Sequence, residues 1–270
     1  MFHCGISARP HRQRREYTAA DLLDATVKGD TSDVLIVAVA AMLAAPQPGC
    51  SAAATATLER ATVLAAEFDL RGASAALDDP AAAECERVRV AVFFVRGLLY
   101  ATDAFRDGGS AESLKPVILA INGLETIARG RRGSAEIARL LLRAAAAAAQ
   151  SERDEMRLYL DAALQMEDVQ RAVGESGAPL VSVSELAGDL WLQVHRYEQA
   201  RLAYAAASER VGTTLRVLAG QARTAARLQT EGEACVRFDT LLAAWGSRLA
   251  IPAEIAEARE YGGRCPRGRP

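Results

Sequence analysis

From residue 52 onward, apolar residues recur at spacings of three and four, which places their side chains on one face of an α-helix. Short breaks rich in Gly, Pro, Asp and Ser interrupt this pattern, most clearly at residues 107–110 and 174–179. Pro116 falls inside one periodic stretch, so we expect that helix to begin late or to bend. The pattern predicts an all-α fold, with helices near residues 52–76, 81–105, 111–129, 134–150, 153–172, 182–194, 196–210, 213–228, 230–247 and 252–261.

The composition agrees with a helical fold and argues against a nucleic-acid partner. Half of the residues are apolar and only 5% are aromatic, and alanine, the residue with the highest helix propensity, is abundant. The basic residues are arginines apart from Lys28 and Lys115, and the formal net charge is −2. A chain with this balance has no strong positive field to attract a phosphate backbone.

Two segments near the C-terminus repeat each other. Ala200 and Tyr204 recur 34 residues later as Ala234 and Phe238, each pair on a helix that follows a shorter helix and a tight turn. A helix-turn-helix period of this length is typical of stacked helical repeats, in which each unit buries its apolar face against the next.

These segments resemble the tetratricopeptide repeat. Residues 181–214 match the family where its two helices approach closely, at the turn, and on the inner face of the second helix; the matching residues are Gly188, Trp191, Tyr197, Ala200, Tyr204 and Ala207. Ser184, His195 and Gly212 depart from the family pattern, which has tryptophan, glycine and proline there. A second unit, residues 215–248, keeps Ala222, Ala234 and Phe238, and a degenerate unit at 137–170 has Ala144, Met156, Leu160 and Ala163 in register.

The resemblance implies antiparallel helix pairs stacked as an α-solenoid, wound into a right-handed superhelix. Residues 180–261 also look like the end of bacterial tetratricopeptide-like proteins of unassigned role, and this likeness brings no catalytic residues with it. We therefore expect repeats with a terminal helix at 181–261, degenerate repeat-like helices at 51–180, and a disordered tail at 262–270.

Residues 1–50 are different in character from the rest of the chain. A basic arm without apolar periodicity precedes twelve consecutive apolar residues at 34–45. This run is too short for a transmembrane helix, which needs about 20 residues. Its length does suit the core of a signal peptide.

Two interpretations of the apolar run stay open. It is either a short buried helix that ends at Pro46 or an export segment. In the second interpretation, Cys50 after Gly49 resembles the lipidated cysteine of a bacterial lipoprotein, although Gln47 and Pro48 depart from that processing motif.

The five cysteines are odd in number and widely scattered, with no CxxC pair. This spacing indicates neither a zinc site nor a dithiol redox centre. We expect buried or incidental thiols, with disulfides possible only in an oxidising compartment.

The sequence predicts no enzyme, no metal site and no cofactor. It contains none of the motifs GxxxxGK[ST], GxGxxG, HExxH and GxSxG, and its three histidines leave little for acid–base chemistry. A candidate binding face does exist, because Arg216, Arg223 and Arg227 share one side of a predicted helix. Such arginines can grip a carboxylate or an acidic peptide, and Asp189 and Gln193 would border the same concave surface. The alternative is an ordinary solvated face.

These observations favour a non-catalytic helical-repeat scaffold that binds a protein or peptide on its concave face in the cytoplasm. One alternative is a factor of the bacterial cell envelope, held at the membrane only if Cys50 is lipidated, that assembles or recruits other proteins. Another is a regulatory module that self-associates through its repeats into a homo-oligomer.

Overall fold

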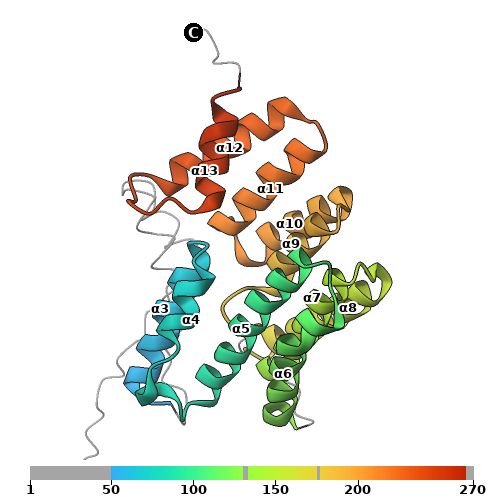
Figure 1. Cartoon of the computed structure of the whole chain (residues 1–270). Helices are drawn as coiled ribbons and strands as arrows, with labels where there is room; N and C mark the ends of the chain where they lie inside the picture. Colours follow the sequence, from blue (N-terminus) through green and yellow to red (C-terminus); the bar gives the residue numbers. More distant parts are fainter. Residues whose placement is uncertain (1–49, 130–132, 175–176, 266–270) are drawn as a thin grey trace, which may run out of the picture.

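The computed structural model describes residues 50–129, 133–174 and 177–265 (Figure 1). Over these ranges the chain forms α-helices and one 3-10 turn and contains no strand, so the all-α prediction is confirmed. The elements are α3 (Ala52–Ala66), α4 (Leu70–Ala76), η2 (Pro80–Ala82), α5 (Glu86–Arg106), α6 (Ala111–Ala128), α7 (Ser134–Ala149), α8 (Arg153–Ala172), α9 (Val183–Gln193), α10 (Tyr197–Val211), α11 (Leu215–Arg227), α12 (Glu231–Trp245) and α13 (Ala253–Gly262).

The helix predicted at 52–76 is two helices. Phe68 has a left-handed backbone with φ of 68°, and the side chain of Asp69 then caps α4 by accepting a 2.7 Å hydrogen bond from the amide of Gly72. A residue in this conformation ends a helix, and it is most often glycine. Because the position holds a phenylalanine, the sequence carries no obvious sign of the break.

Pro116 does not delay α6, which begins at Ala111. Ser110 caps the helix by accepting a hydrogen bond from the amide of Ser113, and this satisfies one of the free amides of the first turn. The expectation of a late start is therefore wrong, and the proline is accommodated five residues into the helix at the cost of one backbone hydrogen bond.

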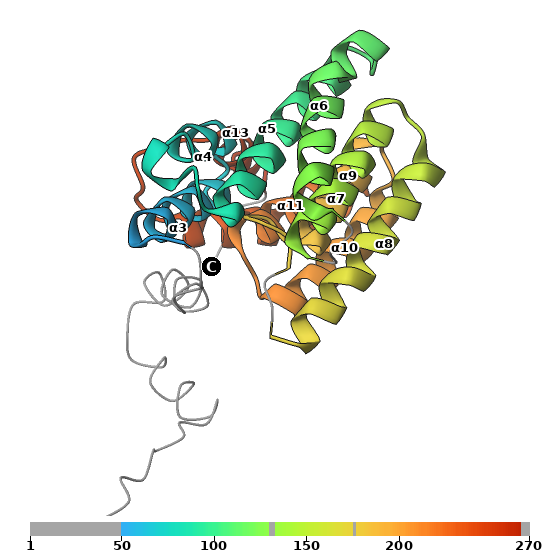
Figure 2. The same ribbon diagram turned by 90° about the horizontal axis from the view of Figure 1, so that it is seen from below.

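Neighbouring helices pack in antiparallel pairs, as Figures 1 and 2 show. The pairs are α5 with α6, α7 with α8, α9 with α10, and α11 with α12. Contacts also join α5 to α7, α7 to α9, and α9 to α11, so the first helix of each pair packs on the first helix of the next.

The 34-residue period is present in the backbone of the last two pairs. His195 and Gln229 end their first helices with φ of 59° and 61°, and the amides that follow them bond back to the carbonyls of Trp191 and Ala225 at 2.9 and 3.0 Å. Gly212 and Gly246 end the second helices with φ of 83° and 65°. The two pairs therefore share both turns, although their side chains at these turns differ.

The turn between α3 and α4 lies against the end of α12 in space (Figure 1). Arg248, after α12, bonds through Nε to Glu67 at the end of α3 over 3.1 Å. The rings of Phe68 and Trp245 lie 6.3 Å apart between centroids, and Phe68 packs against the C-terminal core cluster. The first hairpin thus contacts the last pair across 181 residues of sequence.

Two disulfides join Cys50 to Cys85 and Cys235 to Cys265. The expectation of free thiols is wrong for these four cysteines, because pairing depends on how the helices bring distant residues together, which spacing alone does not reveal. The expectation of disorder is also wrong for residues 262–265, since α13 includes Gly262 and Cys265 is bonded to α12.

The basic arm, the apolar run at 34–45, Cys4 and residues 266–270 lie outside the described residues. None of the helices within residues 50–129, 133–174 and 177–265 combines the length and hydrophobicity needed to cross a bilayer.

Candidate functional site

The contact between the last two helix pairs is built around the ring of Tyr204, which is fully buried. Gly188 on α9 and Gly220 on α11 both pack on this ring. A Cβ atom added at Gly188 would lie 2.5 Å from Tyr204 Cε1, and one added at Gly220 would lie 2.0 Å from Cζ. Only glycine fits at these two positions, because any side chain would overlap the ring.

The hydroxyl of Tyr204 donates a 2.6 Å hydrogen bond to Asp189 Oδ1 on α9. Burial, followed by the charge of Asp189, raises the pKa of Tyr204 well above its usual value. The phenol is therefore a neutral donor, which suits a structural role.

Arg216 on α11 pairs with the other oxygen of the same carboxylate, Asp189 Oδ2. Its side chain is only 14% exposed. Burial alone would lower the pKa of Arg216, but the charges of Asp189 and Glu185 outweigh this effect and raise it. Asp189 therefore connects its own helix to α10 and to α11.

Glu185, a buried carboxylate, joins the starts of α9 and α11. Glu185 Oε2 accepts hydrogen bonds from the amide and hydroxyl of Ser182 at 3.1 and 2.8 Å, and Oε1 accepts one from Thr214 Oγ1 at 2.5 Å. Ser182 and Thr214 are the N-caps of α9 and α11, so this glutamate holds two capped helix ends together.

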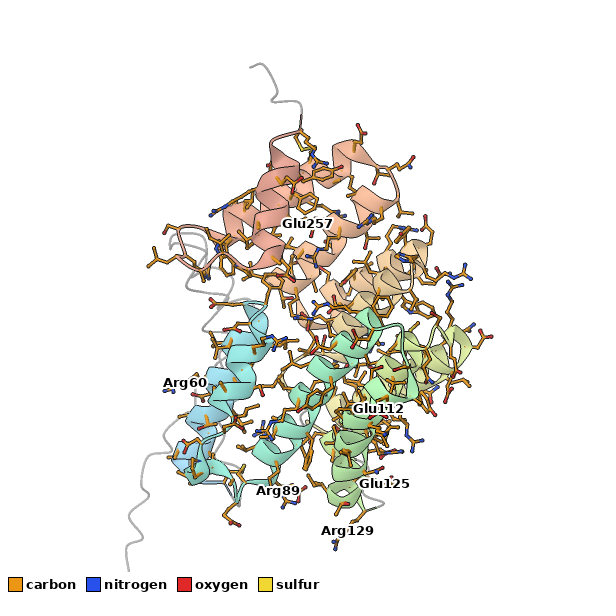
Figure 3. All side chains as sticks on the ribbon, viewed as in Figure 1. Arg60, Arg89, Glu112, Glu125, Arg129 and Glu257 are labelled. Carbon is orange, nitrogen blue, oxygen red and sulfur yellow. A yellow bond between two sulfur atoms is a disulfide. The ribbon has the colours of Figure 1, made fainter. Side chains whose placement is uncertain are left out.

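Arg223 makes the corresponding link from α11 to α13. Its Nε donates to Glu257 Oε2 at 2.6 Å, and its Nη1 lies 3.6 Å from Glu254 Oε1. Burial lowers the pKa of Arg223, and Glu257 and Glu254 more than compensate, so the net shift is upward. Figure 3 labels Glu257 among the side chains of the C-terminal helices.

The structure thus brings Arg216 and Asp189 together and places Arg223 about two turns further along α11, but in each case the arginine faces a carboxylate of this chain. Gln193 is half-buried at the end of α9. Arg227 is exposed at the end of α11 and forms no ion pair within the described part of the chain. Of the three arginines, Arg227 is therefore the one whose charge is open to a ligand.

Sequence reasoning missed the roles of Glu185, Gly220 and Glu257. The spacing Ser182-x-x-Glu185 is a readable capping-box signal for the first of them. The other two have no local signal, because their partners come from helices 16 and 34 residues away and depend on how the helices pack.

Cys50 is placed immediately before α3 with its sulfur bonded to Cys85. The thioether of a lipoprotein uses the same sulfur atom. A lipid on Cys50 and this disulfide therefore exclude each other.

An open depression of about 460 Å³ lies between α3 and the segment from α4 to η2. Alanines form much of its lining, and its polar side chains are largely engaged, since Thr57 donates to Asp79 and Arg96 pairs with Asp78. Figure 3 shows Arg60, another lining residue, pointing outward from α3. In the described ranges, no three His, Cys, Asp or Glu side chains are grouped so as to hold a metal ion.

Comparison with known proteins adds no further assignment: no protein-family model matches the sequence, and no curated protein or solved structure shows significant similarity to it.

Proposed function

We propose that this protein is a non-catalytic scaffold of the tetratricopeptide type, whose helix pairs stack as a right-handed α-solenoid and bind a protein or peptide. The observation that carries the proposal is the 34-residue recurrence of the left-handed turn residues His195 and Gln229. Tyr204 and Phe238, the inner-face positions of the same two units, are both buried. A unit that recurs with its turn and its core position is the basis of a stacked array.

We place the partner-binding surface on the first helices of the pairs, α9 and α11. Because Arg216 and Arg223 are held by carboxylates of this chain, a partner that gripped them would first have to displace Asp189 or Glu257. Breaking such partly buried pairs is unfavourable. We therefore assign recognition to the side chains that are not engaged in this way, with Gln193 and Arg227 as its contact points.

Site-specific photo-crosslinking in the native cells tests this function. A photoreactive amino acid at Gln193 or Arg227 should crosslink to a second protein. The same amino acid at Arg157 on α8 or Arg201 on α10, which are exposed on second helices, serves as the matched control. Crosslinks formed equally from the control positions would remove the concave face from consideration. Crosslinks only to another copy of this chain would replace the proposal with self-association.

A further inference from the structure

Every cysteine in the described ranges is part of a disulfide. Cys50, directly before α3, is joined to Cys85, which stands at the N-cap of α5, with 4.9 Å between their Cα atoms. Cys235 on α12 is joined to Cys265 after α13, with 5.8 Å between Cα atoms. Both separations lie within the range that a disulfide spans. The first bond links the start of α3 to α5 and the second links α12 to the end of α13. A disulfide therefore cross-links the helices at each end of the described chain.

Disulfides of this structural kind persist in oxidising compartments and are rare in the cytosol. We propose that the protein matures and works outside the cytoplasm, that the apolar run at 34–45 is its export segment, and that cleavage between residues 46 and 50 removes this segment without lipidation of Cys50. The proposal does not depend on the partner-binding function.

Two features of the sequence agree with this processing. The run of twelve apolar residues has the length of a signal-peptide core and ends five residues before Cys50. The one cysteine outside the two disulfides is Cys4, which lies upstream of the run. Cleavage after the run therefore removes the odd cysteine and leaves a chain in which every cysteine is paired.

The disulfide also decides between the two forms of export that the sequence leaves open. Lipidation would place a thioether on the sulfur of Cys50, which is the sulfur bonded to Cys85. With that atom in a disulfide, the mature chain carries a free amino terminus close to Cys50. The bond then fixes this new end against the start of α5, where Cys85 is buried.

The proposed maturation has two covalent steps, peptide-bond hydrolysis and thiol oxidation. Cleavage is hydrolysis of one peptide bond by water, which leaves a carboxylate on the export segment and an amine on the mature chain. Each disulfide forms when two thiols together lose two protons and two electrons to a thiol oxidoreductase that bears a disulfide. That disulfide is reduced to two thiols.

The test is intact-mass analysis of the protein isolated from its native cells without reductant, with free thiols blocked at lysis. We expect an N-terminus between residues 46 and 50, no acyl mass, and a mass lower than that of the reduced chain by four hydrogen atoms. No thiol should be alkylated before reduction, and four should be alkylated after it. A product that retains residues before 46, a diacylglyceryl group on Cys50, or thiols that react without reduction would each overturn the proposal.

Single cysteine substitutions test each disulfide separately, so that the pairing can be checked even if one of the two bonds is needed for folding. Cys85→Ser should leave one thiol, that of Cys50, reactive without reduction, and Cys265→Ser should expose that of Cys235. If either variant remained without a reactive thiol, the pairing and the inference drawn from it would be wrong. None of these results depends on the crosslinking experiment, so the two proposals fail separately.

Discussion

Tyr204 and Asp189 are joined by a 2.6 Å hydrogen bond that connects α10 to α9. The same carboxylate pairs with Arg216 on α11, so one aspartate contacts side chains from two of the helices that pack on its own. The aromatic ring between Gly188 and Gly220 adds a tightly packed apolar contact to this polar one. The packing of the last two helix pairs therefore depends on a few residues whose effects can be measured separately.

Tyr204→Phe should change how stability depends on pH. Burial first, and then the charge of Asp189, raises the pKa of Tyr204 well above 10.0 in the folded protein. Above pH 10 the unfolded chain loses this proton while the folded protein keeps it, so the free energy of unfolding falls as pH rises. One such proton corresponds to about 1.4 kcal/mol per pH unit, and below pH 10 the contribution of Tyr204 is fully present.

Urea unfolding of both proteins at pH values from about 8 to 11 measures this effect. At pH 8, Tyr204→Phe should cost about 1 kcal/mol for the lost hydrogen bond. Above pH 10, its stability should decline less steeply than that of the original protein. Parallel declines would show that Tyr204 does not carry the shifted titration.

Gly220→Ala and Gly188→Ala should both destabilise the protein by about 1–3 kcal/mol, because the new methyl group overlaps the ring of Tyr204. These values are net destabilisations, after the gain of about 1 kcal/mol that alanine normally brings inside a helix. Gly232→Ala is the matched control, since nothing lies within 4 Å of a Cβ atom at that position of α12. The control should be neutral or slightly stabilising in thermal unfolding. If all three variants behaved alike, the close packing on Tyr204 would be contradicted.

Arg216→Met should destabilise the protein by about 2–4 kcal/mol, because it leaves the carboxylate of Asp189 partly buried without its cationic partner. Arg227→Met, which removes an exposed charge from the same helix, should change the free energy of unfolding by less than about 0.5 kcal/mol. Denaturant unfolding of the two variants compares them directly. Equal, small effects would mean that the Asp189 pair is not structurally important and that Arg216 is open to a ligand.

The helical pattern predicted most of the fold from residue 81 onward because its breaks are chemically explicit. Ser110 and Ser182 cap helices as their spacing suggests, and Gly108 and Gly212 have the left-handed backbone that glycine permits. The break at Phe68 was missed because a phenylalanine occupies a conformation for which glycine is the usual signal.

Little of the candidate site could be predicted in this way. Periodicity places Arg216 and Arg223 on one side of α11, but it does not say which helix faces that side. Their carboxylates come from α9 and α13, and the choice between an open face and an ion pair is made by tertiary packing. The disulfide pairing could not be predicted either, because it depends on which helix ends meet.

Gln229→Gly should stabilise the protein, since Gln229 ends α11 with φ of 61° and its exposed side chain makes no hydrogen bond within the described residues. A left-handed backbone costs a non-glycine residue about 1–2 kcal/mol, and the greater freedom of glycine in the unfolded chain offsets part of that gain. The net effect should be about 0.5–1 kcal/mol. Gln229→Val should have the opposite sign, because a β-branched side chain fits this conformation least well.

Gly212→Ala supplies the converse control, because it puts a methyl group on a left-handed backbone with φ of 83° and no atom within 4 Å to collide with. Its cost of about 1 kcal/mol would come from the backbone alone. Thermal unfolding should therefore rank Gln229→Gly above the original protein and place Gly212→Ala and Gln229→Val below it. A Gln229→Gly variant that melted lower than the original protein would contradict the left-handed turn, and with it the 34-residue recurrence on which the repeat proposal rests.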